Sequence, residues 1–295
     1  MVLLKKCIIF ALTLSLVLSA VTGAMAAFPT VKAPGSFEVD TIWSIDWDDP
    51  FYEFGINYNN NSDDFFAWGK YYLNDFTFAD LFVGEDYFNL NGSYLFDNGF
   101  FIGGAFIDDN DQDCFIIAPG YRFSLGERSY VALGLNYFDY DDDEEFAFDI
   151  NSKLYFDDAR LIANLLIPED SPIELYIEPT FKISEDVVVG GALGYLEDAD
   201  EELAVAAGLT WQPENWIVDT ILAFNYNHAD AYYFKVGGLY TFNNQFGIGA
   251  DISKLEDTDT EFALKFKYQF DEKSDLKFYY EFEAENLTLT YFSNF

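Results

Sequence analysis

The sequence has little of what a helical, disulfide-stabilised or nucleic-acid-binding protein needs. No segment after residue 36 shows a convincing 3.6-residue periodicity, which argues against amphipathic helices. The chain has two cysteines, and Cys7 lies in the apolar N-terminal stretch, so a disulfide within an exported chain is excluded. Lys and Arg number 15 against 52 Asp and Glu, giving a net charge of -37. Because like charges repel, nucleic acid is excluded as a partner.

Residues suited to catalysis or metal binding are equally scarce. The one histidine, His228, stands beside Asp230 in an expected loop, and the chain has no Gly-x-Ser-x-Gly sequence. An enzyme acting on lipid or peptide is therefore the least favoured functional class. The acidic runs 108–113 and 139–145 lack the Asp-x-Asp-x-Asp-Gly pattern of calcium loops, and Cys114 shows no metal-ligand spacing. We predict no catalytic residue, no metal and no cofactor.

Only the N-terminus holds a long apolar run. Lys5 and Lys6 precede the apolar stretch 7–21, and residues 24–26 read Ala-Met-Ala, which fits the cleavage site of a secretory signal peptide. A membrane anchor is the alternative. No later stretch approaches the ~18 to 20 apolar residues that a spanning helix needs. The expected organisation is a signal peptide over 1–26, a short periplasmic lead over 27–36 and one β domain over 37–295.

What the sequence does have is a period of two in an unusually aromatic chain. Aromatic residues make up 20% and hydrophobic residues 51% of the composition, beside the large acidic excess. A disordered acidic chain is poor in aromatics, so the two classes must be separated in space. The segment 261–270 shows how, because Phe262, Leu264 and Phe266 alternate with Ala263, Lys265 and Lys267. Such alternation is typical of strands with two unlike faces.

The alternation predicts about eighteen strands, with sixteen as the alternative. Single-chain bacterial membrane barrels have an even strand number. Clusters of Asp, Glu, Asn, Gly and Pro separate the segments. The expected strands cover 37–48, 51–60, 65–73, 87–97, 99–107, 114–125, 129–139, 146–156, 161–167, 173–183, 187–196, 203–211, 216–226, 232–242, 245–254, 262–270, 276–283 and 287–295.

One segment is ambiguous in this pattern. Residues 76–83 read Phe-Thr-Phe-Ala-Asp-Leu-Phe-Val, which fits a strand or a loop. If they form a strand, 37–48 must lie outside the ladder to keep the number even. We prefer the loop, because 37–48 has a clean face of Phe37, Val39 and Trp43. The loop 74–86 would then be the one connection long enough to constrict an interior.

The two faces of each strand differ sharply in charge. One face carries large apolar residues and, within the strand interiors from residue 114 onward, no charge; Lys254 at a strand end is a nearby exception that could snorkel. A soluble sandwich buries such a face, whereas a membrane barrel turns it to lipid. The opposite face holds the charged residues Arg122, Asp149, Lys153, Glu174, Glu178, Lys182, Asp219, Lys235, Asp251, Lys265, Lys267, Lys277 and Glu281.

The connections favour the membrane barrel. Counted back from the last strand, the odd connections hold 23 Asp or Glu and no Lys or Arg, whereas the even connections hold 10 acids and three bases. Such sorting suits a protein with two fixed sides. Aromatic residues also gather near strand ends, as expected of the two interfacial girdles. The three bases are Arg128, Arg160 and Lys273.

The end of the chain resembles the last strand of bacterial outer-membrane β-barrel proteins. Leu287, Leu289 and Tyr291 alternate toward the final Phe295, while Ser293 departs from the usual apolar residue. The resemblance implies an all-β, antiparallel transmembrane barrel in the cell outer membrane. It also implies recognition of Tyr291 and Phe295 by the barrel-assembly machinery. The resemblance covers the mature chain at the level of architecture, porin-like but of no specific family, and leaves a homo-oligomer open.

A barrel of this size leaves an aqueous channel, so we expect a porin-like channel for passive diffusion of ions and small hydrophilic solutes. Its partners would be membrane lipid and those solutes. The alternative is a structural or adhesive barrel with a closed lumen, and a barrel enzyme ranks below both. The expected pore-lining residues are Arg122, Lys153, Lys182, Lys235, Lys265, Lys267, Lys277, Glu174, Glu178, Asp219 and Asp251.

Overall fold

The computed structural model describes residues 50–295, apart from the short segments 61–63, 86, 110–111, 127, 141–142, 170–171, 197–201, 225–231, 243–244, 257, 272 and 295. The expected signal peptide, the lead and the expected strand 37–48 lie outside the described residues. The regular structure of the described part is entirely β. No helix there is long and apolar enough to cross a membrane.

Eighteen strands make up this part, and their bounds follow the alternation of the sequence closely. They are β1 (Phe51–Asn59), β2 (Asp64–Asn74), β3 (Thr77–Gly84), β4 (Tyr87–Leu95), β5 (Phe100–Asp109), β6 (Gln112–Ser124), β7 (Tyr130–Tyr140), β8 (Asp143–Phe156), β9 (Ala159–Pro168), β10 (Glu174–Ser184), β11 (Val187–Leu196), β12 (Glu202–Trp211), β13 (Trp216–Phe224), β14 (Tyr233–Phe242), β15 (Phe246–Leu255), β16 (Glu261–Gln269), β17 (Ser274–Glu281) and β18 (Asn286–Asn294).

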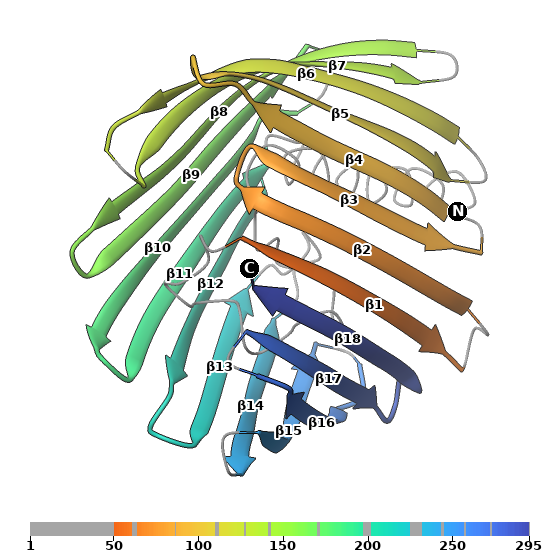
Figure 1. Cartoon of the computed structure of the whole chain (residues 1–295), viewed down its shortest axis with the longest axis vertical. Helices are drawn as coiled ribbons and strands as arrows, with labels where there is room; N and C mark the ends of the chain where they lie inside the picture. Colours follow the sequence, from red (N-terminus) through yellow and green to blue (C-terminus); the bar gives the residue numbers. More distant parts are fainter. Residues whose placement is uncertain are drawn as a thin grey trace.

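The strands close into one antiparallel barrel (Figure 1). Each strand pairs with its neighbours in the sequence, and β1 closes the ring by pairing with both β2 and β18. At the closure, Phe51 lies opposite Asn294 on one side and Tyr72 on the other. Closure leaves no edge strand, so the strands of the wall find their hydrogen-bond partners within the barrel. The expected all-β barrel of eighteen strands is confirmed, and the alternative of sixteen is wrong.

The preferred reading of segment 74–86 as a loop is wrong. Residues 77–84 form β3, which pairs with β2 and β4, and only Asp75 and Phe76 remain as the turn before it. With β2 and β18 flanking β1, both neighbouring positions of the first described strand are filled. The pattern was hidden because β3 carries apolar residues on both faces, with Phe78 and Phe82 on one and Leu81 and Val83 on the other.

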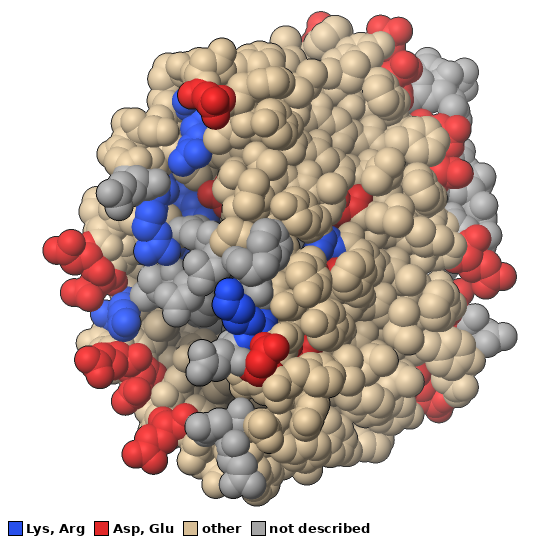
Figure 2. Space-filling model, in the orientation of Figure 1, with Lys and Arg blue, Asp and Glu red and all other residues tan. Residues whose placement is uncertain are grey.

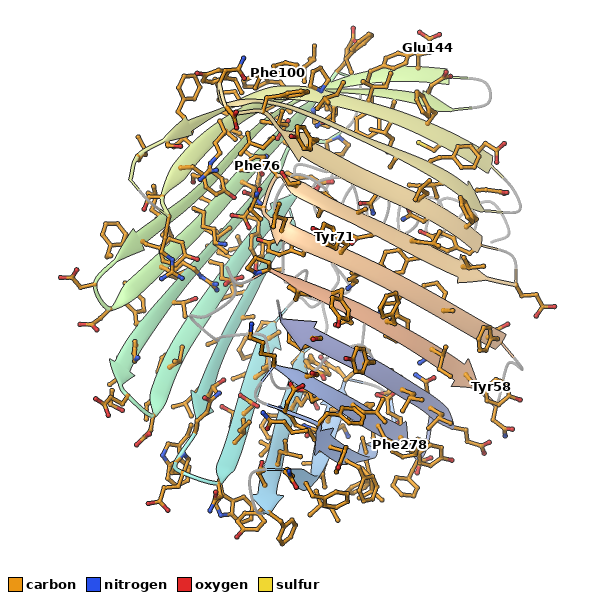
Figure 3. All side chains as sticks on the ribbon, in the orientation of Figure 1. Tyr58, Tyr71, Phe76, Phe100, Glu144 and Phe278 are labelled. Carbon is orange, nitrogen blue, oxygen red and sulfur yellow. The ribbon has the colours of Figure 1, made fainter. Side chains whose placement is uncertain are left out.

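The two faces of the wall follow the period of two. Large apolar residues on the outer face are exposed, for example Leu135 at 48% and Leu222 at 43%, while their sequence neighbours Asn136 and Ile221 on the inner face are buried. Figure 3 shows side chains standing alternately on the two sides of the ribbon. A shift of one residue would exchange the faces, so the alternation fixes the register of each strand.

The barrel has two unlike rims. We call the end where β18 finishes and β1 begins the C-terminal rim, and the other end the opposite rim. The opposite rim carries connections such as 85–86, 256–260 and 282–285, which contain acids but no Lys or Arg. Figure 2 shows red patches without blue along its right-hand edge, red with blue at the left, and a largely uncharged band between.

Candidate pore wall

The inner face of the barrel is the candidate functional surface, and most Lys and Arg of the described chain lie on it. Strands β14 to β17 carry its densest ionic cluster. Lys235 Nζ lies 3.2 Å from a carboxylate oxygen of Asp251, and Lys265 Nζ bonds the other oxygen of the same group. Antiparallel pairing brings these residues together. Asp251 is paired with Gly237, two residues from Lys235 on the same face, and Lys265 is paired with Gly249, two residues from Asp251. The cluster therefore combines two cations and one anion on the barrel wall.

Further ion pairs lie on the same wall. Arg160 on β9 donates a hydrogen bond to Glu178 on β10 at 2.8 Å, and both side chains are almost fully buried. The hydroxyl of Tyr176 donates to the second oxygen of Glu178 at 2.8 Å, so both carboxylate oxygens are bonded. Burying two charges is costly unless they are paired and hydrogen-bonded, and the two bonds to Glu178 reduce that cost for its carboxylate.

Two more pairs lie on either side of the barrel closure. On β1 and β2, Glu53 accepts a hydrogen bond from the indole of Trp68 at 2.7 Å and lies 3.7 Å from Lys70. On β16 and β17, Lys267 lies 3.2 Å from Asp275. Carboxylates thus neutralise bases around much of the wall, which leaves little excess positive charge inside.

Two carboxylates are held by neutral groups. Asn136 donates to Asp149 at 3.3 Å, and Asn151 donates to its other oxygen. On β12 and β13, the hydroxyl of Thr210 donates to Asp219. These bonds orient the buried carboxylates and satisfy part of their hydrogen-bonding capacity.

The inner face is not polar throughout. Between β5 and β9 a buried apolar cluster turns inward near the opposite rim, formed by Ile107, Ile116, Phe138 and Leu166 with smaller neighbours. A second inward cluster, on β12 to β15, contains Ile221 and Tyr233. The wall therefore alternates between ionic and apolar sectors around its circumference.

Comparison with solved structures places this architecture among known proteins. Three variants of the porin of Rhodopseudomonas blastica superpose on the chain with a TM-score of 0.50. The match covers 84% of this chain and 99% of each porin chain at 11% sequence identity. The chain has the fold of a bacterial porin. No protein-family model and no curated protein matches the sequence.

In this porin fold, the predicted pore-lining residues lie on the inner face. Asp251 meets Lys235 and Lys265, whereas Arg122 lies over the rings of Phe76 and Tyr130 at 5.5 and 5.0 Å. The ionic pairing itself was not predicted. The partners of four others are Asp75 for Lys153, Asp275 for Lys267, Arg160 for Glu178 and Thr210 for Asp219. Glu174 is half-buried near the opposite rim, and Lys182 is exposed at the C-terminal rim. Lys277 lies 5.8 Å from the centre of the Phe292 ring.

Several inner residues of the porin fold were missed by sequence reasoning. Arg160 was placed in a connection, but it belongs to β9 and is fully buried. Asp75 was placed in a loop, although it contacts Lys153 at 3.2 Å. Arg160 carried a usable signal, because it continues the alternation of Ile162 and Asn164 on the inner face. No sequence signal marks the contact of Asp75.

The remaining candidates concern assembly and metals. Tyr291 lies on β18 beside the barrel closure, facing Phe54 of β1 and Leu276 of β17. Phe295, His228 and Asp230 lie outside the described residues, so the assembly signal and the enzyme alternative stay predictions. Over the residues described, three or more His, Cys, Asp or Glu side chains never gather as a metal site.

Proposed function

We propose that this chain is an outer-membrane channel for passive diffusion of ions and small hydrophilic solutes. The supporting observation is the closed ring of eighteen strands with charged side chains inside and exposed Phe, Leu and Ile outside. Barrels of eight strands fill their interior with side chains, whereas those of sixteen to eighteen leave a channel. An apolar outer belt suits hydrocarbon, and an ionic inner wall suits water.

The expected orientation in the membrane follows from the resemblance of the last strand. With the C-terminal rim in the periplasm, the acidic opposite rim faces the outside. An acidic mouth concentrates cations, while carboxylates pair with many of the bases on the wall. We therefore expect a weak preference for cations that is set at the mouth. The barrel-assembly machinery and membrane lipid are the expected partners. The proposal is compatible with a monomer and with a homo-oligomer.

Conductance tests the proposal directly. The processed protein is inserted into planar lipid bilayers, single-channel currents are recorded, and reversal potentials are measured across a KCl gradient. Discrete channels with a reversal potential on the cation side support the proposal, and a reversal potential on the anion side refutes the proposed preference.

A matched pair of variants shows whether ions pass through the barrel. Lys267 lies on the inner face of β16 and Lys254 on the outer face of β15. Lys267→Glu should move the reversal potential toward cation selectivity, because the added carboxylate lines the path. Lys254→Glu makes the same charge change on the outer face and should leave the reversal potential near the wild-type value. Equal shifts of the reversal potential in both variants would show that the ions do not pass through the lumen.

A structural barrel with a closed lumen is the second candidate. The observation in its favour is the turn between β2 and β3, whose residues Asp75 and Phe76 are buried in the interior. Liposome swelling separates the two functions. Liposomes that contain an open channel take up small sugars and swell, whereas liposomes that contain a closed barrel do not. No residue is proposed as catalytic.

A further inference from the structure

The turn between β2 and β3 differs from the other turns of the C-terminal rim. Apolar residues in those turns are exposed, as shown by Phe96 at 43%, Leu125 at 61% and Phe270 at 52%. Those three residues continue the outer faces of their strands, whereas Phe76 continues the inner face of Phe78 and is 1% exposed. A turn residue on an aqueous rim has no reason to be buried unless the turn itself folds inward.

Phe76 packs against strands that are not neighbours of its own hairpin. Its ring lies 4.9 Å from the ring of Phe101 on β5 and 4.9 Å, edge to face, from that of Tyr130 on β7. The guanidinium of Arg122 on β6 covers both Phe76 and Tyr130. Aromatic pairs and cation–π contacts of this kind fix a geometry beyond simple burial. The turn is therefore held inside the curve that β3 to β8 describe.

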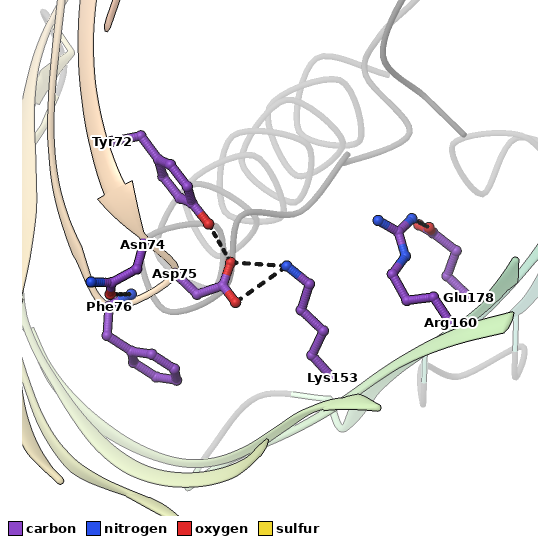
Figure 4. Close-up of polar contacts among 7 residues, drawn as sticks. All are labelled: Tyr72, Asn74, Asp75, Phe76, Lys153, Arg160 and Glu178. Carbon is purple, nitrogen blue, oxygen red and sulfur yellow. Dashed lines mark hydrogen bonds and ion pairs between the residues drawn. The ribbon is translucent and has the colours of Figure 1, made fainter. Parts of the chain in front are cut away.

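Asp75 extends this contact farther around the barrel. Its carboxylate accepts hydrogen bonds from Lys153 on β8, at 3.2 and 3.3 Å to the two oxygens, and from the hydroxyl of Tyr72. Four strands, β4 to β7, separate β3 from β8 in the ring. Figure 4 shows Lys153 and Asp75 pointing toward each other from facing parts of the wall.

The turn is also fixed locally. The side-chain oxygen of Asn74 accepts the backbone N–H of Phe76 at 3.0 Å, which is the hydrogen bond of an Asx turn. Asp75 and Phe76 therefore enter the interior in one defined conformation. A buried carboxylate without its cation is strongly unfavourable, so the Lys153 pair is the contact on which the inward position depends most.

We propose that the β2–β3 turn is a constriction element, latched by the Asp75–Lys153 pair, that narrows the channel at the C-terminal rim and sets its solute size limit. This inference rests on the proposed channel function. The constriction is made by a two-residue turn. It carries Phe76 into the sector enclosed by β3 to β8, where the ring packs against Phe101 and Tyr130.

The test compares three variants with the wild type. Lys153→Glu sets two carboxylates against each other and should release the turn. The double variant Asp75→Lys with Lys153→Glu restores an opposite pair, and Lys273→Glu makes the same charge change in an exposed turn of the same rim. Conductance is recorded in 1 M KCl, where screening reduces surface-charge effects to about 3 Å. The size limit is measured with polyethylene glycols of increasing mass.

We expect Lys153→Glu to conduct at least about twofold better than the wild type and to admit larger polymers. The double variant and Lys273→Glu should stay near the wild-type values. If Lys153→Glu misfolds, Phe76→Ala removes the apolar anchor without changing charge and should widen the channel in the same direction.

The outcomes separate the two claims. A conducting wild type with unchanged conductance and size limit in Lys153→Glu and Phe76→Ala overturns the constriction and leaves the channel function standing. A silent wild type with a conducting Lys153→Glu supports the latch, as a turn that closes the lumen. Silence in every folded variant overturns both claims.

Discussion

A charge placed on the outer face at mid-strand tests whether that face contacts lipid. Leu135 is the sixth of the 11 residues of β7, and its side chain is 48% exposed on the outer face. An arginine at the bilayer midplane of a barrel costs about 2 to 4 kcal/mol, and one near the interface costs about 0 to 1 kcal/mol. Leu135→Arg should therefore lower the free energy of unfolding by about 2 to 4 kcal/mol.

Val131 provides the matched control on the same strand and face. It lies four residues from Leu135, which is about 14 Å along the strand and about 10 Å along the membrane normal at a tilt near 40°. The apolar belt extends about 12 Å from its midplane, so position 131 lies close to the interface. Val131→Arg should cost no more than about 1 kcal/mol.

The assay is reversible denaturant unfolding of the protein refolded into lipid vesicles, with free energies extrapolated to zero denaturant. The slopes should agree between variants, so that the midpoint reports stability alone. If the outer face met water, both substitutions would be ordinary surface changes within about 0.5 kcal/mol. Equal and small effects at 131 and 135 would refute the lipid-facing assignment.

Three further predictions concern the wall. Glu178→Ala should lower the free energy of unfolding by about 3 to 5 kcal/mol, because it leaves the buried Arg160 uncompensated, and Glu178→Ala with Arg160→Met should recover most of the loss; the same unfolding assay checks both. Gly120→Ala should cost about 1 to 3 kcal/mol, since its Cβ would lie 2.5 Å from the carbonyl of Leu133, whereas Gly194→Ala, whose nearest contact is 3.8 Å, should be tolerated. Asp149→Leu should cost less than Asp149→Ala, because leucine refills the volume beside Asn136 and alanine leaves a cavity; a larger loss for leucine would contradict this.

The faces of the wall could be predicted from the sequence where the alternation is clean. On β7 and β14, most residues of one face are large and apolar, so Leu135 and Phe234 were placed outward correctly. Period two reports only which side a residue faces. It says nothing of which inner side chains meet, and for that reason the Arg160–Glu178 and Lys235–Asp251 pairs appear only in the structure.

The errors also have a physical cause. β3 was ambiguous in the sequence because its inner face carries Phe78 and Phe82, so neither face stands out. The loop was then preferred because the segment 37–48 shows the cleaner face. The inward turn at Asp75 and Phe76 brings β2–β3 against β5 to β8, and no local pattern encodes a contact across four intervening strands. The apolar inner cluster around Ile116 and Phe138 was hidden in the same way, because both faces of these strands are apolar.

Accessibility to lipid at two consecutive positions tests the inside-out arrangement most directly. Ile252 on β15 is 37% exposed on the outer face, and Ser253 follows it on the inner face. Each is changed to cysteine in a Cys114→Ser protein, labelled with a fluorophore and reconstituted with lipids brominated in their acyl chains. We expect strong quenching at position 252 and little at position 253. Equal quenching at both positions would contradict a wall with hydrocarbon on one side and the lumen on the other.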